Sequence, residues 1–387
     1  MSLPPLSLYI HVPWCERKCP YCDFNSHQVR SDFDEPSYIK ALLNDLDDDI
    51  KRFGSSVTDR PVETIFIGGG TPSLFSSDSY RILFAGIRER LTLTSDAEIT
   101  LEANPGSSET KKFEGFYRAG INRLSIGVQS YNKTHLRALG RVHSAQEAIN
   151  AATFAKLAGF KNFNLDLMFG LPEQSTEQAL ADLKQAISLS PTHLSCYQLT
   201  IEPNTLFYNT PPITPDDETL WDMQNVLQKL LAGKAYEQYE VSAYSKDAKQ
   251  CQHNLNYWLF GDYLGIGAGA HGKITERDEI IRTWKIKHPT TYIERETKVG
   301  GQNPVEPQQV PFEFMMNALR LNNGFSIKMF EERTSMPVST INPILEKHNS
   351  QDLIQISDTR ISPTEFGHNM LNVMLQDYLD FQLPARH

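Results

Sequence analysis

Three of the five cysteines of the chain lie close together, at Cys15, Cys19 and Cys22. Three thiols leave one unpaired, so a disulfide is a poor explanation of this C-x3-C-x2-C spacing. A structural zinc ion would need a fourth ligand, such as His11 or His27. A [4Fe–4S] cluster held by three thiolates leaves one iron open to a small chelating molecule. The spacing favours the cluster, with zinc and a chance grouping as alternatives.

The composition is typical of a globular protein in a reducing compartment. The chain has 387 residues, of which 40% are hydrophobic and 22% charged, enough for one large domain and a smaller one. The net charge of −10 disfavours a nucleic-acid partner, because such proteins usually carry a basic face. We find no pattern of a signal peptide and no run long enough to span a membrane. We therefore expect a cytoplasmic protein with no transmembrane segment, whose crowded cysteines serve metal or redox chemistry.

Short β-rich runs alternate with longer helical patterns in the first half of the chain. Six runs predict strands, at residues 6–12, 63–70, 98–105, 123–130, 162–172 and 193–201. Helical patterns lie between them, at residues 35–53, 77–91, 108–119, 144–159 and 175–189. The near-continuous apolar strands indicate a parallel sheet covered on both faces. We expect an α/β fold, a partial (β/α)6 TIM-like barrel, with a doubly wound sheet as the alternative.

The second half of the chain is less regular. A helix is predicted over residues 215–234 and a hairpin over residues 353–364. The run VGGQNPVEP (299–307) is typical of a linker.

This pattern predicts two domains. The first covers residues 1–290 and carries the barrel together with an extension that holds the motif HNLNYW (253–258). The second covers residues 300–387 and is smaller, mainly helical and winged-helix-like. It offers no arginine-rich recognition helix, so we expect it to pack or to bind a partner protein.

Glycine and polar residues gather where the expected strands end. GGGTP (68–72) follows the second strand and by itself is equally a turn that begins a helix. Glu102, Gln129, Arg141 and Asp166 stand on later strand ends or in the loops after them. Each alone is most simply a solvated terminus, yet together an arginine can pair with a carboxylate, and carboxylates or amides can hold an ammonium or ribose hydroxyls. Asp166 is the most informative, because a charge inside an apolar strand requires a partner.

Together these motifs resemble the radical SAM superfamily. The resemblance rests on the C-x3-C-x2-C loop, FIGGGTPS, LEANP, SIGVQS, GRVH, LDLMFGLP and LSCYQLTIEP, and it covers roughly the whole chain. It implies that S-adenosylmethionine (SAM) chelates the open iron, and that one electron from the cluster can cleave SAM to a 5′-deoxyadenosyl radical. The implied SAM-binding residues are Tyr9, Tyr21, Gly69, Gly70, Thr71, Glu102, Gln129, Arg141, Asp166 and Thr200. The stretch GIGAGAH (265–271) is implied near the same region.

Within the superfamily the chain resembles the oxygen-independent coproporphyrinogen III oxidase group. Phe24 stands where the oxidase has a further cysteine, and only eight residues precede Tyr9, where the oxidase carries an extension. HNLNYW matches the H-N-x-x-Y-W motif of the HemW-like haem chaperones of this group. The resemblance therefore implies a haem chaperone, with oxidative decarboxylation of coproporphyrinogen III as the alternative. A radical SAM enzyme acting on RNA is a third alternative, which the acidic balance disfavours.

The HNLNYW motif has a structural explanation and a functional one. Tyr257 and Trp258 fit a packed core, while an imidazole is a common haem ligand and aromatic rings pack on porphyrins. With the resemblance, the expected haem-binding residues are His253 as ligand, Asn254, Tyr257 and Trp258. Cys251 and His271 are second choices for the ligand, although Cys251 and Cys196 equally fit as small apolar fillers.

The expected cofactors are a [4Fe–4S] cluster, SAM and haem. The expected partner is a haem-acceptor protein, such as a respiratory membrane complex, and not a nucleic acid. Whether SAM is cleaved stays open, and the sequence assigns no catalytic residue.

Overall fold

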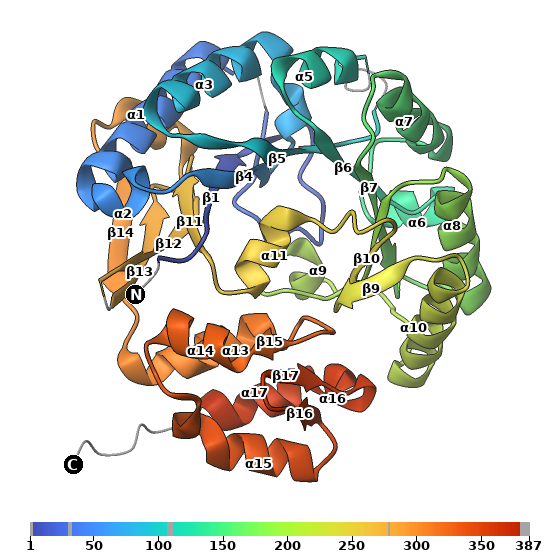
Figure 1. Ribbon diagram of the computed structural model, residues 1–387. Coiled ribbons are helices and arrows are strands. Elements are labelled where there is room, and N and C mark those ends of the chain that lie inside the picture. The colour runs from blue at the N-terminus through green and yellow to red at the C-terminus, as the bar shows by residue number, and fades with distance from the viewer. Residues whose placement is uncertain (1–2, 30–32, 107–110, 278, 380–387) are drawn as a thin grey trace.

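One long sheet forms the body of the molecule in the computed structural model, which describes residues 3–29, 33–106, 111–277 and 279–379 (Figure 1). The sheet has the strand order β14-β13-β12-β11-β1-β4-β5-β6-β7-β8-β10-β9. Six neighbouring strands are parallel: β1 (Leu6–Val12), β4 (Val62–Gly69), β5 (Leu93–Ala103), β6 (Arg123–Gln129), β7 (Phe163–Phe169) and β8 (His193–Gln198). These are the six predicted strands, in the predicted order.

Helices connect these strands and cover the outer face of the curved sheet (Figure 1). They are α1 (Glu35–Phe53), α3 (Ser77–Arg90), α5 (Phe113–Ala119), α7 (Ala145–Leu157) and α8 (Thr176–Ser188). Helices α7 and α8 each begin with a capping box, built by Ser144 with Glu147 and by Ser175 with Gln178. The partial (β/α)6 barrel is therefore confirmed. Of the helix predicted over 108–119, residues 108–110 lie outside the described residues.

The two faces of the six strands differ in chemistry. Along β1, Leu6, Leu8 and Ile10 belong to the apolar core beneath the helices. The alternate positions of the strands turn inward, and most of them are polar: Ser7, Thr64, Glu98, Thr100, Arg123, Ser125, Asn164, Asp166, His193 and Ser195. The six strands are therefore apolar on the outer face, which the helices cover, and mostly polar on the inner face, which lines the interior of the barrel.

The sheet is extended at both edges and does not close. Strand β11 (Asp262–Ile266) runs parallel to β1, followed by the antiparallel β12 (His271–Glu276), β13 (Glu279–Lys285) and β14 (Val299–Pro304). At the other edge lie β10 (Ala243–Ser245) and β9 (Glu237–Glu240).

The linker predicted over 299–307 was wrong, because β14 pairs with β13. A β-carbon at Gly301 would lie 2.2 Å from the Trp284 indole, so glycine there lets the ring lie across the edge strand.

The C-terminal part has its own core, with Phe314, Phe325 and Phe330 at its centre. It contains α13 (Val310–Ala318), α14 (Ile327–Thr334), α15 (Asn342–Ser350), α16 (Glu365–Asn369) and α17 (Leu371–Leu379), and a sheet of β15 (Phe325–Ser326), β17 (Arg360–Pro363) and β16 (Ile354–Ile356). Strands β16 and β17 confirm the predicted hairpin. Phe314 packs on Phe260 of the barrel domain, with ring centroids 5.6 Å apart.

The remaining elements complete the described chain. They are β2 (Trp14–Cys15), β3 (His27–Gln28), α2 (Ser55–Thr58), α6 (Lys133–Ala138), α9 (Leu206–Asn209), α10 (Asp217–Ala232), α11 (Gln252–Trp258), α12 (Pro289–Glu294) and the 3-10 turns at Pro72–Leu74, Pro307–Gln309 and Val338–Ile341. Helix α10 is the helix predicted over 215–234. Within the described ranges, no helix has the length and apolar character needed to cross a membrane.

Candidate cluster and cofactor site

Two cavities adjoin each other at the carboxyl ends of the barrel strands. The first has a volume of about 400 Å³ and contains the three clustered cysteines in its wall. The second has a volume of about 880 Å³ and lies between β1, α11 and the strands β11 to β13. Gly69, Glu102, Asp23 and Phe24 line both cavities, so the two spaces are neighbours.

The cysteine loop is pinned at its two ends. Strands β2 and β3 pair in parallel, with Trp14 opposite His27 and Cys15 opposite Gln28. The Trp14 ring packs edge-on against Tyr38 of α1, with centroids 4.6 Å apart. The loop that carries Cys19 and Cys22 is thereby held over the first cavity.

The thiols suit a positively charged group. All five cysteines are free thiols in the structure, so no disulfide crosses the loop. Burial raises the pKa of the Cys15 thiol to about 11 and also raises the pKa of Cys22. Thiolates at these positions therefore require cationic partners, which the irons of a cluster supply. Arg141 Nη1 donates to Cys19 Sγ at 3.8 Å, the kind of contact that stabilises a cluster thiolate.

The zinc alternative finds less support in the arrangement. Across the described ranges, no three His, Cys, Asp or Glu side chains converge on a point where one metal ion could sit. His11 shares Nδ1 with the Tyr9 hydroxyl at 3.0 Å and Nε2 with Asn25 O at 2.9 Å, so neither ring nitrogen is free. A [4Fe–4S] cluster needs a different arrangement, because each thiolate binds a different iron and the three sulfurs need not converge on one point.

The glycines of GGGTP are required by close backbone contacts. A β-carbon on Gly69, whose φ is +110°, would lie 2.4 Å from the His11 ring, and one on Gly70 would lie 2.4 Å from Trp14 O. Gly70 N–H donates to Val12 O at 2.7 Å and Thr71 N–H donates to Trp14 O at 2.6 Å. These two hydrogen bonds hold the turn against the start of the cysteine loop, with backbone groups of the turn facing the first cavity.

Two carboxylates that line the first cavity, Glu102 and Asp166, are hydrogen-bonded to neutral groups. Glu102 Oε2 accepts from Gly69 N–H at 3.1 Å. Asp166 accepts from the Ser125 hydroxyl at 3.0 Å and from the Asn164 amide at 2.7 Å. Burial raises the pKa of both carboxyls, that of Glu102 to about 7, and these hydrogen bonds act against the rise. An ammonium or hydroxyl ligand would therefore be favoured in this cavity.

Arg141 and Gln129 are held in place by strand ends. Arg141 Nη2 donates to Asn104 Oδ1 at 2.6 Å and to Gly127 O at 2.8 Å, while its buried Nε has no partner among the described residues. Gln129, with φ of +67°, accepts from the Tyr197 hydroxyl at 2.6 Å. Both side chains line the first cavity, where Arg141 can meet a ligand carboxylate.

The first cavity brings together almost all of the residues expected to bind the cluster and SAM. Its wall includes Cys15, Cys19, Cys22, Tyr21, Gly69, Gly70, Thr71, Glu102, Gln129, Arg141, Asp166 and Thr200. Tyr9 is the exception and lines the second cavity, with Gly269 and His271 from the GIGAGAH stretch. Asn254 of the HNLNYW motif lines the first cavity, whereas Tyr257 and Trp258 line the second.

Sequence reasoning missed the polar floor of the first cavity. Arg123, Ser125, Asn164, His193 and Ser195 line it and all point inward from their strands. Asn164 Nδ2 donates to Ser125 Oγ at 2.9 Å, and its Oδ1 meets His193 Nδ1 at 2.7 Å. The alternation of side chains along a strand could have identified these residues, because positions an even number apart face the same side. Each floor residue lies an even number of positions from a predicted site residue or from another floor residue on its strand.

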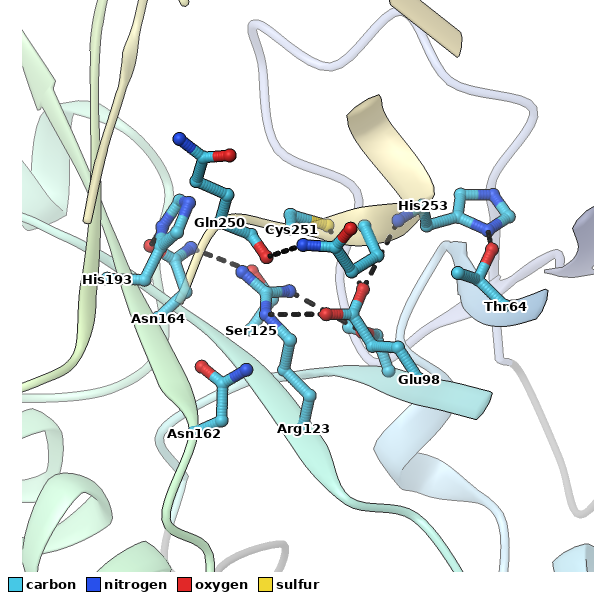
Figure 2. A network of polar contacts seen from close by, with 12 residues as sticks. Thr64, Glu98, Arg123, Ser125, Asn162, Asn164, His193, Gln250, Cys251 and His253 are labelled. Atoms are coloured by element: carbon cyan, nitrogen blue, oxygen red, sulfur yellow. Dashed lines mark hydrogen bonds and ion pairs between the residues drawn. The ribbon is translucent and has the colours of Figure 1, made fainter. Parts of the chain in front are cut away.

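A buried polar network joins this floor to the HNLNYW helix (Figure 2). Arg123 Nε lies 3.9 Å from Glu98 Oε2, and the two side chains point toward each other. The backbone N–H of His253 and the thiol of Cys251 donate to Glu98 Oε1 at 3.3 and 3.6 Å. The start of α11 is therefore anchored on the barrel strands, and Cys251 is a buried structural thiol in this arrangement.

His253 is enclosed by hydrogen bonds. Its side chain is 0% exposed, with Nδ1 2.7 Å from Thr64 Oγ1 and Nε2 2.9 Å from the Tyr257 hydroxyl. Because the Thr64 hydroxyl donates to Ser7 Oγ, His253 Nδ1 donates to Thr64 and Nε2 accepts from Tyr257. Burial lowers the pKa of His253 to about 3, so the ring is neutral. This arrangement leaves His253 no free nitrogen for a haem iron and gives it the role of positioning Tyr257.

The raised pKa of Glu102 predicts a pH-dependent stability. Its folded-state pKa of about 7 exceeds the ordinary value of 4.5, so the folded cofactor-free protein holds the proton more tightly than the unfolded chain. The contribution of Glu102 to the free energy of unfolding should therefore fall as the pH rises from about 4.5 to about 7 and stay constant above that. Urea unfolding of the wild type and Glu102→Gln across this range measures the contribution as a difference. Equal pH dependence in the two proteins would contradict the prediction, and Glu89→Gln at the exposed surface is the control.

Comparison with known proteins identifies the family and the fold. A model of the radical SAM superfamily matches residues 9–186, and a model of the HemN C-terminal domain matches residues 305–368. The coproporphyrinogen III oxidase HemN from Escherichia coli, described as a radical SAM enzyme, superposes with a TM-score of 0.81 at 22% identity, covering 98% of this chain and 91% of that one. That likeness establishes a shared fold.

Curated relatives give a narrower assignment. The heme chaperone HemW of Escherichia coli (strain K12) is 50% identical over 380 residues, covering 98% of this chain and 99% of the relative. The heme chaperone HemW of Bacillus subtilis (strain 168) is 33% identical over 381 residues, covering 96% and 99%. The chain therefore belongs to the radical SAM superfamily and, within it, to the HemW family.

Proposed function

We propose that this protein is a haem chaperone, which binds a [4Fe–4S] cluster and SAM in the first cavity, carries haem and delivers it to acceptor proteins. The observation that carries the proposal is the end-to-end similarity to proteins named heme chaperone HemW, at 50% identity over 98% of the chain. The cavity that contains the clustered cysteines and most of the residues expected to bind SAM is compatible with that role. A respiratory membrane complex as acceptor, and a cytoplasmic location, stay predictions.

The residues of the first cavity divide the work of binding. Cys15, Cys19 and Cys22 would hold three irons, and the cluster would supply the electron needed to cleave bound SAM. Arg141 would pair with the SAM carboxylate, and the backbone from Gly69 to Thr71 would accept from its ammonium.

The remaining polar residues would hold the rest of SAM. Glu102, Gln129 and Asp166 would accept from the ammonium or from the ribose hydroxyls. Tyr21 would contact the adenine, and Thr200 would lie at the exposed rim.

Oxidative decarboxylation of coproporphyrinogen III is the alternative activity. Phe24 lines both cavities and its side chain is 56% exposed, so an apolar ring stands where the oxidase has a further cysteine. We therefore expect the reconstituted protein, supplied with SAM and reductant under anaerobic conditions, to leave coproporphyrinogen III unchanged. Chromatography of the porphyrins after oxidation measures this directly, and conversion to protoporphyrin would overturn the chaperone proposal.

Haem delivery can be separated from passive release. Haem-loaded protein is mixed with a haem-free respiratory cytochrome subunit or with apomyoglobin, which takes up only haem that has dissociated. Faster transfer to the cytochrome than to apomyoglobin is the expected result, because direct contact avoids the dissociation step. Equal rates with both acceptors would show passive release and contradict delivery.

A further inference from the structure

The second cavity is built by three segments that are far apart in the sequence. Asn25, just after the cysteine loop, donates through Nδ2 to Ala268 O at 2.9 Å and to Lys287 O at 2.8 Å. The loop between β11 and β12 is therefore tied to the cysteine loop. With a volume of about 880 Å³, the cavity lies within the range of about 300–1,000 Å³ that is typical of small-molecule sites.

One wall of this cavity is aromatic. Tyr257 and Trp258 come from α11, and Tyr263 of β11 packs edge-on against Tyr257 with ring centroids 4.5 Å apart. The Tyr257 hydroxyl donates a hydrogen bond to His253 Nε2 at 2.9 Å, on the side of the ring away from the cavity. The motif HNLNYW thus presents flat rings to the cavity and keeps its histidine out of it, which suits a planar apolar ligand.

Cations lie around the same cavity. Lys273 is paired with Asp262 at 2.9 Å, and Arg282 is paired with Glu313. Lys18 and Lys287 are exposed, and neither forms an ion pair with any carboxylate in the described part of the chain. Among the described residues, Lys18 Nζ donates to Phe24 O alone, at 3.2 Å, so these two ammonium groups are available to acidic groups of a ligand.

Three histidines line the cavity, and they differ in availability. Both nitrogens of His11 are occupied by Tyr9 and Asn25. His27 shares Nε2 with Asn25 Oδ1 at 3.3 Å. The His271 side chain is exposed to the cavity, and its ring makes no hydrogen bond to any residue in the described ranges.

We propose that the second cavity binds the haem, with His271 as the axial ligand of the iron and the propionates on Lys18 and Lys287. This rests on the proposed function and assigns its site. The macrocycle lies against Tyr257 and Trp258, which gives the HNLNYW motif a packing role in haem binding. Because Gly69 and Glu102 line both cavities, the tetrapyrrole lies beside the SAM site.

The iron ligand is tested by titrating ferric haem into the reconstituted protein under anaerobic conditions. His271→Ala should lose the magnetic circular dichroism and electron paramagnetic resonance signals of a histidine-ligated haem, and added imidazole should restore them. His253→Ala and His288→Ala should keep the ligand signals, and His288, exposed and outside the cavity wall, is the matched control.

The propionate contacts have a matched ligand probe. Lys18→Gln combined with Lys287→Gln should weaken haem binding by about fivefold, since two exposed charge pairs together contribute roughly 1 kcal/mol. Haem dimethyl ester has no carboxylates, so its affinity should be the same for the wild type and the double variant. Metal-free protoporphyrin IX should respond to the lysine changes and be insensitive to His271→Ala.

Failure of this assignment differs from failure of the proposed function. If the wild type does not bind haem, the chaperone function itself is contradicted. If the wild type binds haem and His271→Ala leaves both spectrum and affinity unchanged, the function stands and the site assignment is overturned. A loss of the histidine signal in His253→Ala alone would return the ligand to the motif and equally overturn it.

Discussion

Cys19→Ala is expected to leave the purified protein without its cluster. With Cys19 removed, only Cys15 and Cys22 would remain, and two irons of the cubane would lack a protein ligand. Iron and acid-labile sulfide should fall from about four of each per chain after reconstitution to background. Colorimetric iron and sulfide analysis and the loss of the broad visible absorption of the cluster measure the effect.

Cys196→Ala is the matched control for this prediction. Cys196 lies in β8, is 8% exposed and faces the apolar core, so its loss should leave the iron content unchanged. Iron at wild-type level in Cys19→Ala would contradict the cluster assignment. Stoichiometric zinc in the reconstituted wild type would contradict it as well.

Lys285→Met should lower the free energy of unfolding at neutral pH by about 3–5 kcal/mol, since it removes the ammonium that pairs with two buried carboxylates. Lys285 Nζ lies 2.5 Å from Asp45 Oδ1 and 2.7 Å from Asp49 Oδ1, and its side chain is 1% exposed. Asp45 also accepts from Gly267 N–H at 3.1 Å, so this group of ion pairs holds the loop that precedes His271 in place. Urea unfolding followed by circular dichroism measures the change.

The pH gives this prediction a distinct signature. Burial raises the pKa of both carboxyls, that of Asp49 to about 6 even with Lys285 present. Without the ammonium both carboxyls would bind protons more tightly still, so the deficit of the variant should shrink as the pH falls toward the pKa of about 6 that Asp49 has with Lys285 present. A deficit that does not depend on pH would contradict an electrostatic origin.

A surface ion pair supplies the control for Lys285→Met. Asp47 pairs with Arg90 at 2.7 Å but is 49% exposed. Asp47→Asn should therefore cost less than about 1 kcal/mol. A similar cost for the two substitutions would show that burial does not explain how much Lys285 and its two carboxylate partners contribute to stability.

Local signals in the sequence determined the elements of the barrel and singled out the three cysteines proposed as cluster ligands. Strand β1 was predicted over its full length, and α7 and α8 were predicted beside the capping boxes at Ser144 and Ser175. Periodicity, caps and cysteine spacing involve residues that are close together in the chain, so they can be recognised without knowledge of the fold. The C-x3-C-x2-C loop is such a signal, and all three cysteines line one cavity.

Tertiary packing decided which side chains share a cavity. Tyr9 was expected beside SAM but lies in the second cavity, which depends on the pairing of β1 with β11, a strand more than 200 residues away in the chain. Strand β14 joins the sheet where a linker was expected, which depends on pairing at the edge of the sheet. His253 and His271 cannot be ranked from their neighbours in the sequence. Hydrogen bonds with Thr64 and Tyr257 enclose the His253 ring, while the His271 ring lies at the cavity wall without a hydrogen bond to any described residue. Residue type is a local property, but whether a nitrogen is free depends on partners that only the folded chain brings to it.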